Sequence, residues 1–88
     1  MSWKVEVKPT AEKQYLKLDK DTRIRIQRSL KELEQDENPL SNRNVKRLSG
    51  RLDGDYRLRV GDWRLLFTPD KERNIIHIYA ILPRGDAY

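Results

Sequence analysis

Residues 55–68 read Asp-Tyr-Arg-Leu-Arg-Val-Gly-Asp-Trp-Arg-Leu-Leu-Phe-Thr, and this stretch decides the fold. Apolar and polar side chains alternate on both sides of Gly61-Asp62, which is the pattern of two half-buried strands joined by a two-residue turn. Glycine at the first central position suits a primed hairpin turn, because it adopts a positive φ without strain. The stretch therefore predicts a β-hairpin.

A two-residue turn also fixes which residues of the hairpin lie opposite each other. The predicted apolar face pairs Val60 with Trp63, Leu58 with Leu65 and Tyr56 with Phe67. The other face then carries Arg57, Arg59 and Arg64, with Arg59 directly across from Arg64. Like charges in that position weaken a hairpin, so stability of the fold gives no reason for the arrangement. We interpret these arginines as a basic face that binds an anion, in preference to an ordinary solvated surface.

The residues before the hairpin predict one strand and two helices. Residues 3–8 alternate apolar and charged side chains, as a strand with one buried face does, and Pro9 is expected to close it. Thr10 is the expected N-cap of a short helix that ends near Leu18. A longer helix is expected to be capped by Asp19 or Asp21 and to end at Asn38-Pro39. The side chains expected to face the core from these helices are Ala11, Tyr15, Leu18, Ile26, Leu30 and Leu33.

The remaining segments complete the sheet. Residues 39–54 are rich in Asn, Ser, Gly and Arg and predict a loop with a short strand at Val45–Leu48. Pro69–Arg73 is expected to be a turn, and residues 74–82 are apolar at almost every position, as in an interior strand. His77 lies inside this strand, where a structural role is more common than catalysis. The expected fold class is α+β, with two N-terminal helices packed on one face of a small, mainly antiparallel, twisted β-sheet.

Length and composition limit what such a chain can do. With 88 residues it has room for a single domain, residues 1–88, with a thin core and an open groove in place of a deep cavity. No cysteine and one histidine are present, so we expect no disulfide, no metal site and no cofactor. No stretch is long and apolar enough to span a membrane, so a cytoplasmic protein without membrane contact is expected.

The net charge of +5 is concentrated in the middle of the chain. Residues 43–64 contain seven basic side chains against three acidic ones. The basic side chains are Arg43, Lys46, Arg47, Arg51, Arg57, Arg59 and Arg64. Six of the seven are arginine, whose planar guanidinium binds phosphate through two hydrogen bonds and stays protonated. An anionic polymer is therefore the expected partner.

Together these features form a recognisable pattern. Its parts are two helices, Lys46-Arg47-Leu48-Ser49-Gly50, the hairpin string from Tyr56 to Leu65, an apolar strand, and Arg84 followed by Tyr88. The pattern resembles the RelE/ParE superfamily of toxins from type II toxin–antitoxin systems over nearly the whole chain. In that superfamily, RelE-like members are ribosome-dependent endoribonucleases that cut messenger RNA in the decoding site, whereas ParE-like members share the fold and poison DNA gyrase. Arg84 and Tyr88 favour the RelE branch.

The resemblance also implies site residues. The basic pair of the family falls on Arg57 and Arg59, the arginine of the return strand on Arg64, and the C-terminal arginine and tyrosine on Arg84 and Tyr88. RelE-type enzymes can carry lysines in the basic pair, and a lysine with a lowered pKa can act as a general base. Arginine cannot, so the mechanism here must differ at that point.

RNA is cut without a metal when its own 2′-hydroxyl attacks the adjacent phosphate. We therefore expect Arg64 and Arg84 to bind the scissile phosphate and Arg57 and Arg59 to bind the leaving group or flanking phosphates. Tyr88 is expected to be either the general base or the residue that stacks on a base, since neighbouring guanidinium groups lower the pKa of a phenol. Three further basic residues, Lys46, Arg47 and Arg51, are expected to bind RNA or the ribosome.

Two other functions stay open at this point: a ParE-like inhibitor of DNA gyrase, and a non-catalytic module that binds RNA or the ribosome. The partners implied by the resemblance are messenger RNA on the ribosome, with contacts to ribosomal RNA, and a cognate antitoxin. The antitoxin is expected to cover the basic face or to displace the C-terminal segment with an acidic or amphipathic helix.

Overall fold

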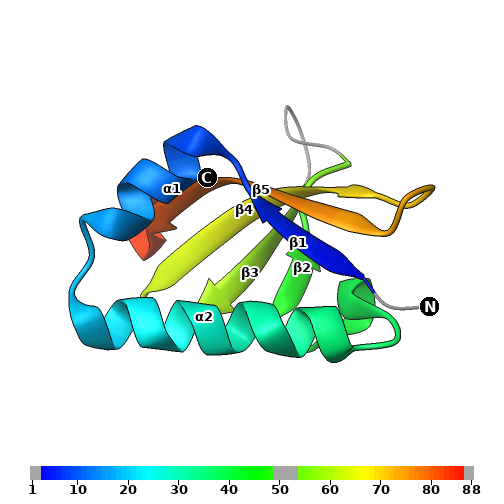
Figure 1. The fold of residues 1–88 in the computed structure, drawn as a ribbon, viewed down its shortest axis with the longest axis horizontal. Coiled ribbons are helices and arrows are strands. Elements are labelled where there is room, and N and C mark those ends of the chain that lie inside the picture. Colours follow the sequence, from blue (N-terminus) through cyan, green and yellow to red (C-terminus); the bar gives the residue numbers. More distant parts are fainter. Residues whose placement is uncertain (1–2, 49–53, 87–88) are drawn as a thin grey trace.

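The computed structural model describes residues 3–48 and 54–86, which form two helices on one face of a five-stranded sheet (Figure 1). The strands are β1 (Lys4–Val7), β2 (Val45–Arg47), β3 (Tyr56–Val60), β4 (Trp63–Asp70) and β5 (Ile75–Pro83). The helices are α1 (Pro9–Leu16), α2 (Lys20–Gln35) and two short 3-10 helices, η1 (Pro39–Ser41) and η3 (Arg84–Asp86). The predicted α+β class is confirmed.

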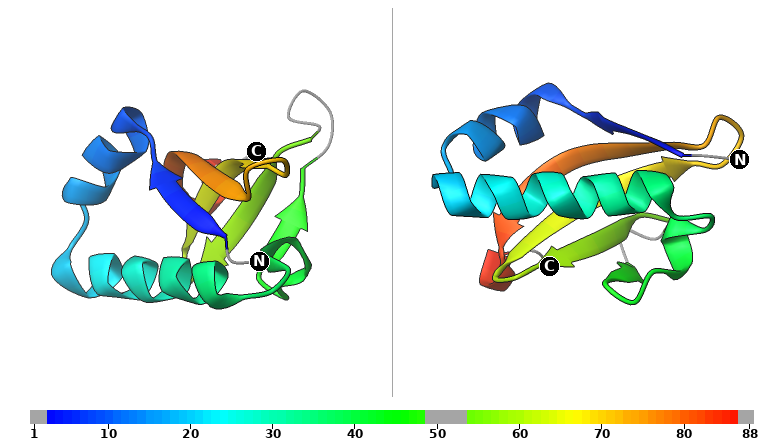
Figure 2. Two further views of the ribbon diagram at one scale, coloured as in Figure 1. Left: turned by 45° about the vertical axis from the view of Figure 1, so that its right-hand side comes forward. Right: turned by 60° about the horizontal axis from the view of Figure 1, so that its bottom comes forward.

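The order of strands across the sheet is β1-β5-β4-β3-β2. β1 runs parallel to β5, and the other three pairs are antiparallel. The last strand in the chain therefore lies between the first strand and β4. Both helices lie on the same side of this curved sheet (Figure 2), and no described helix is long and apolar enough to cross a membrane.

The hairpin has the predicted register. Val60 pairs with Trp63, Leu58 with Leu65 and Tyr56 with Phe67, while Arg59 lies opposite Arg64. Gly61 has a φ of +59° and Asp62 has no positive φ, as in a type II′ turn. The glycine predicted to open a primed turn is therefore in the conformation that favours it.

The core lies between the helices and the apolar face of the sheet. Phe67 and Leu65 on β4 are completely buried, as are Ile26 and Leu33 on α2 and Ala11 on α1. Tyr15, Leu18 and Leu30, also predicted to face the core, are partly buried against it. The inward-facing residues of both helices were thus predicted correctly.

The ends of the helices were predicted less well. α1 begins at Pro9, with Lys8 in the N-cap position and no side-chain cap, so the prediction of Thr10 as N-cap is wrong. Proline fits the first turn of a helix, where its missing N–H needs no partner, and this preference outweighs the threonine cap. The predicted cap of α2 is confirmed at Asp19, whose side chain accepts a hydrogen bond from the backbone N–H of Thr22.

Further boundaries differ from the expectation, among them the end of α1, which is at Leu16 and not near Leu18. α2 ends at Gln35, before Asn38-Pro39, and Pro39 begins η1. The predicted strand at Val45–Leu48 is one residue shorter. β4 continues through Pro69 to Asp70, because β3 pairs with β4 only as far as Phe67 and proline is tolerated where one side of a strand has no partner. The turn to β5 consequently comes after Asp70.

Candidate functional site

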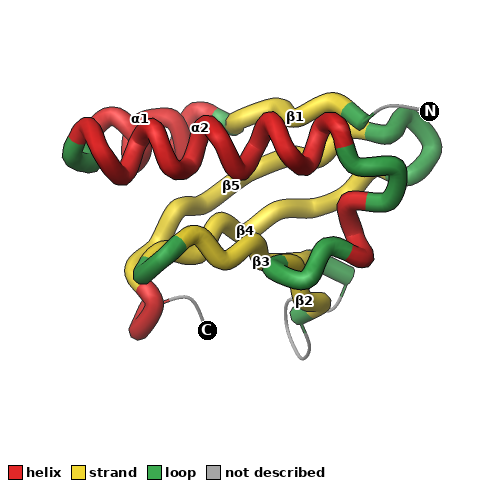
Figure 3. The backbone as a smooth tube through the Cα atoms, turned by 90° about the horizontal axis from the view of Figure 1, so that it is seen from below, coloured by secondary structure: helices red, strands yellow, loops and turns green. Residues whose placement is uncertain are grey.

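An open groove of about 620 Å³ lies between α2 and the turn of the β3–β4 hairpin. Its lining residues are Arg25, Arg28, Ser29, Asn44, Arg59, Val60, Gly61, Asp62, Arg64 and Arg84. Five arginines against one aspartate give this arginine groove a net charge of +4. Seen from the side of α2, the hairpin turn and η3 lie next to each other at one end of the molecule (Figure 3). The surface is basic, shallow and formed by four separate parts of the chain.

The Gly61-Asp62 turn holds these parts together. The Arg64 guanidinium folds back on it, because Nη1 donates hydrogen bonds to the carbonyl oxygens of Gly61 and Trp63, both at 2.9 Å. The backbone N–H of Arg84 donates to the carbonyl oxygen of Asp62 at 2.9 Å, which docks η3 on the turn. From α2, Nη1 of Arg25 comes within 3.3 Å of the point where a Cβ on Gly61 would lie. Three arginines thus surround one turn.

Arg64 differs from the other arginines of the groove in its burial. Its side chain is 8% exposed, whereas Arg25, Arg28, Arg59 and Arg84 are exposed. The two carbonyl bonds occupy part of the donor set of the Arg64 guanidinium and leave further N–H groups for a ligand. A buried, hydrogen-bonded guanidinium has a fixed position, as stabilisation of a developing charge requires.

No acidic side chain forms an ion pair with the five groove arginines within residues 3–48 and 54–86. Arg59 donates one long hydrogen bond, 3.4 Å, from Nη2 to the Asn44 side-chain oxygen, which is neutral. Guanidinium groups that outnumber the carboxylates around them repel one another and lower the stability of the fold. Such a cluster has the chemistry of a site for a polyanion, because phosphate groups would supply the missing negative charge.

The structure brings together three of the residues predicted for the site, Arg59, Arg64 and Arg84. Arg57 is half-buried on β3 opposite Leu66 and Lys46, and neither basic residue lines the groove. Arg47 ends β2 and is also outside the groove. The predicted residues Arg51 and Tyr88 lie outside the residues that the structure describes.

Sequence reasoning missed two arginines of the groove, Arg25 and Arg28, and the amide of Asn44. Along the sequence, these arginines look like Arg23 or Lys31, all on the polar side of an amphipathic helix. Which of them face the hairpin turn depends on how α2 crosses the sheet. No local signal in the sequence gives that crossing.

A second groove, of about 320 Å³, lies between α1 and α2 and is mostly apolar. Its lining includes Tyr15, Leu16, Leu30 and one carboxylate, Glu12, and it has no basic side chain. Its chemistry does not suit a polyanion. Among the described residues, no group of three or more His, Cys, Asp or Glu side chains is placed to hold a metal ion.

His77 is half-buried on β5, opposite Glu6 of β1. Its Nδ1 atom lies 3.2 Å from a carboxylate oxygen of Glu6, and it is not among the residues that line the arginine groove. The one histidine of the chain therefore lies beside a carboxylate and away from the groove, and its buried Nδ1 makes no hydrogen bond within the described residues.

The other end of the hairpin holds a polar cluster of a different kind. Asp55 accepts hydrogen bonds from the hydroxyl of Tyr79 at 2.8 Å and from the hydroxyl of Thr68 at 2.9 Å. Burial, together with the bond to Asp55 and its negative charge, raises the pKa of Tyr79 well above the usual range of a tyrosine. This phenol is therefore neutral at physiological pH and serves as a hydrogen-bond donor.

The family described as ParE toxin of the type II toxin–antitoxin system, parDE, matches residues 5–88. The chain belongs to this family. It is thus a toxin of a type II toxin–antitoxin system, as the resemblance implied. No curated protein matches the sequence of this toxin.

Solved structures of RelE proteins share the fold of this toxin. The RelBE2 toxin–antitoxin complex of Mycobacterium tuberculosis is 24% identical, with a TM-score of 0.81 over 96% of this chain and 100% of that chain. The RelE–RelB complex of the archaeon Pyrococcus horikoshii is 28% identical, with a TM-score of 0.79 over 99% and 100%. Free Escherichia coli RelE with two arginines replaced by alanine is 22% identical, with a TM-score of 0.73 over 99% and 87%. The predicted RelE-like fold is confirmed.

Proposed function

We propose that this toxin is an endoribonuclease that cuts messenger RNA in the A site of the ribosome. The observation that carries the proposal is the arginine groove, where Arg59, Arg64 and Arg84 gather around the hairpin turn without a carboxylate partner in the described residues. An RNA backbone supplies the negative charge that this cluster lacks. Its open shape also suits a strand presented by a larger assembly.

The proposed chemistry needs no nucleophile from the protein. The ribose 2′-oxygen attacks the adjacent phosphorus, the bond from phosphorus to the 5′-oxygen breaks, and a 2′,3′-cyclic phosphate forms. One proton leaves the 2′-hydroxyl and one joins the departing 5′-oxygen. The reaction therefore needs charge stabilisation on the phosphate and management of two protons.

Arg64 and Arg84 are the proposed ligands of the scissile phosphate. Arg64 is fixed by two carbonyl bonds. At Arg84 only the backbone is fixed to the same turn, and its exposed side chain is to be ordered by the phosphate that it binds. Guanidinium groups held in place stabilise a pentacoordinate phosphorane more strongly than water does. Arg59 is the proposed ligand of a flanking phosphate, and Arg57, Lys46, Arg47 and Arg51 are proposed contacts to RNA or ribosome outside the groove.

Tyr88 is the proposed general base or stacking residue. Arginine stays protonated at neutral pH, so the groove itself contains no side chain suited to accept the 2′-hydroxyl proton, apart from the carboxylate of Asp62. A phenol both stacks on a base and exchanges a proton, and positive neighbours lower its pKa. A scarcity of side chains suited to proton transfer is consistent with an enzyme whose substrate is positioned by the ribosome.

The proposed protein partner is a cognate antitoxin, since the similar structures include one described as a toxin–antitoxin complex and one described as a RelE–RelB complex. A helix or extended segment rich in carboxylates complements the charge of the arginine groove. Bound there, it blocks access of RNA to Arg59, Arg64 and Arg84. The cognate antitoxin should accordingly lose affinity when these arginines are neutralised.

The test uses the purified toxin with programmed ribosomes and primer extension along the message. Arg84→Ala is expected to lower the cleavage rate about 10²- to 10³-fold, which is typical for loss of one oriented charge-stabilising group. The matched control is Arg73→Ala, which removes one exposed positive charge from the turn at the other end of the sheet. An Arg84→Ala toxin that cuts like the wild type would remove this residue from the mechanism. A wild-type toxin that cuts no message would refute the function.

A second function, inhibition of DNA gyrase, is favoured by one observation, the description of the matching family as ParE toxin. It predicts gyrase-dependent breaks in DNA and no RNA products. A supercoiling assay with purified gyrase, run beside the ribosome assay, separates the two functions. A third outcome, binding to ribosomes without products from either assay, identifies a non-catalytic binding module.

A further inference from the structure

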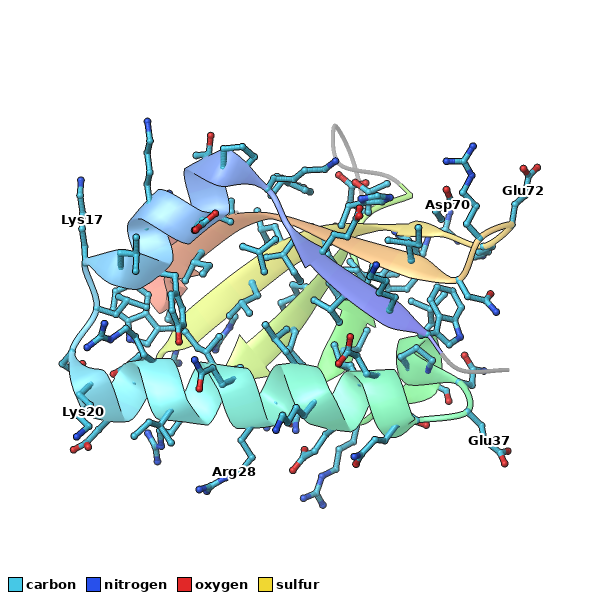
Figure 4. The ribbon with its side chains drawn as sticks, in the orientation of Figure 1. Lys17, Lys20, Arg28, Glu37, Asp70 and Glu72 are labelled. Atoms are coloured by element: carbon cyan, nitrogen blue, oxygen red, sulfur yellow. The ribbon has the colours of Figure 1, made fainter. Side chains whose placement is uncertain are left out.

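Two arginines of the groove come from outside the hairpin and the C-terminal segment. Arg25 and Arg28 are three residues apart on α2 and therefore lie on one side of that helix. Both line the arginine groove opposite the hairpin turn. Figure 4 shows Arg28 extending from α2 away from the sheet, into solvent.

These two side chains are held differently from Arg64. The side chains of Arg25 and Arg28 are exposed and make no hydrogen bond or ion pair within the described part of the chain. Exposed guanidinium groups on long, free side chains adapt to the position of a phosphate but do not provide the fixed geometry that transition-state stabilisation needs. Their chemistry is that of backbone binding.

The path of a bound backbone is limited by charge. Arg25 and Arg28 also line a neighbouring hollow of about 550 Å³ whose other walls include the carboxylates of Asp19 and Asp21. Phosphates are attracted to the arginine groove and repelled from the far wall of this hollow. The two arginines therefore form the end of the positive track that starts at Arg84 and Arg64.

We propose that Arg25 and Arg28 form a second row of phosphate ligands, which anchors the RNA beside the nucleotide held by Arg59, Arg64 and Arg84. This inference rests on the proposed function, because it assumes that RNA occupies the arginine groove. The pair acts in binding and takes no part in the chemical step. The phosphates belong either to the message or to ribosomal RNA, two sources with the same chemistry.

The test compares Arg25→Gln/Arg28→Gln with Lys20→Gln/Lys31→Gln. Both double variants remove two positive charges from α2, but Lys20 and Lys31 line neither the arginine groove nor the neighbouring hollow. Equal thermal melts by circular dichroism show that both variants are folded. Because both variants lose the same charge, a difference in RNA affinity between them reports direct contact with RNA and not general electrostatic attraction.

Binding is measured against two probes, a short single-stranded RNA with 2′-O-methyl groups, which cannot be cut, and ribosomes without message. The arginine variant is expected to bind about tenfold more weakly than the lysine variant, and the slope of log affinity against log salt is expected to fall by about 1.4, or about 0.7 per lost phosphate contact. A loss with the oligonucleotide identifies the message as the source. A loss with ribosomes alone identifies ribosomal RNA.

Cleavage at toxin concentrations below saturation is expected to fall about tenfold in the arginine variant, in step with its weaker binding, and to stay within about threefold of the wild type in the lysine variant. The inference is overturned if the two double variants bind both probes equally, or if the arginine variant binds normally and cuts slowly. The binding arms do not depend on cleavage. Absence of any cleavage by the wild type would therefore refute the proposed function, while the binding measurements would still test whether Arg25 and Arg28 bind RNA.

Discussion

Two polar clusters lie at opposite ends of the β3–β4 hairpin, and they are built in opposite ways. At the open end, Asp55 accepts a hydrogen bond from Tyr79 and another from Thr68, so a donor meets an acceptor within the fold. At the turn, the exposed arginines of the groove meet no carboxylate partner among the described residues. The Asp55 cluster pairs its hydrogen-bond donors with an acceptor, whereas the arginine groove keeps an excess of positive charge.

The difference separates polar groups that stabilise the fold from polar groups available to a ligand. A satisfied cluster makes the folded state more stable, because its bonds replace bonds to water. An unsatisfied cluster of one charge has the opposite effect and is retained at a cost to stability. Arg64 belongs to both kinds, since it is buried and bonded to turn carbonyls while it lines the groove.

The largest effect on stability is expected from removing Asp55, the hydrogen-bond acceptor at the open end of the hairpin. Asp55→Ala leaves the hydroxyls of Tyr79 and Thr68 without their partner, and the free energy of unfolding is expected to fall by about 2 kcal/mol. Urea denaturation followed by tryptophan fluorescence measures the change. The matched variant is Arg59→Ala at the other end, expected to change stability by less than about 0.5 kcal/mol. Equal losses in the two variants would show that the ends do not differ.

The pH dependence of stability tests the role of Tyr79 as the hydrogen-bond donor at the open end. Folding raises the pKa of Tyr79, so its contribution is fully present below the ordinary tyrosine value of about 10 and is lost as the pH rises above that value. Tyr79→Phe is expected to be about 1 kcal/mol less stable than the wild type near pH 8, because the bond to Asp55 is missing. Near pH 11 the gap should close, since the wild type must then keep a proton that its unfolded chain releases. A gap that stays constant from about pH 8 to 11 contradicts the assigned donor role.

The smallest expected effect concerns repulsion in the arginine groove. Arg59→Gln removes one charge and is expected to raise the free energy of unfolding by up to about 0.5 kcal/mol at low salt. The gain should vanish near 1 M salt, where charges are screened within about 3 Å. Thermal melts of the variant and the wild type across salt concentrations measure it. A loss of stability at low salt would show that Arg59 makes a favourable contact instead.

The hairpin was predictable because its rules are local. A two-residue turn at Gly61 allows one register, and alternation from Tyr56 to Phe67 then assigns each side chain to a face. The burial of Arg64 was not predictable, because folding back onto its own turn depends on a rotamer that alternation does not specify. It was expected on an open basic face, and its side chain is instead 8% exposed.

The arginine groove was predictable only in part, because it joins distant segments. Arg59 and Arg64 are placed by the hairpin itself, and Arg84 follows the neighbouring strand in the sheet. Arg25 and Arg28 depend on the packing of α2 over the sheet, for which a single sequence provides only the apolar stripe. That stripe indicates which side of the helix is buried. It does not indicate which segments of the chain lie next to the polar side chains of the helix.

The position of β5 between β1 and β4 has a consequence for synthesis of the toxin. The first strand has no neighbour in the sheet until residues 75–83 have left the ribosomal tunnel, since β1 pairs with β5. The complete sheet can therefore form only after β5 has been synthesised. A chain that ends before β5 lacks both this interior strand and Arg84. Early termination of translation therefore yields chains without a complete arginine groove, since Arg84 follows β5.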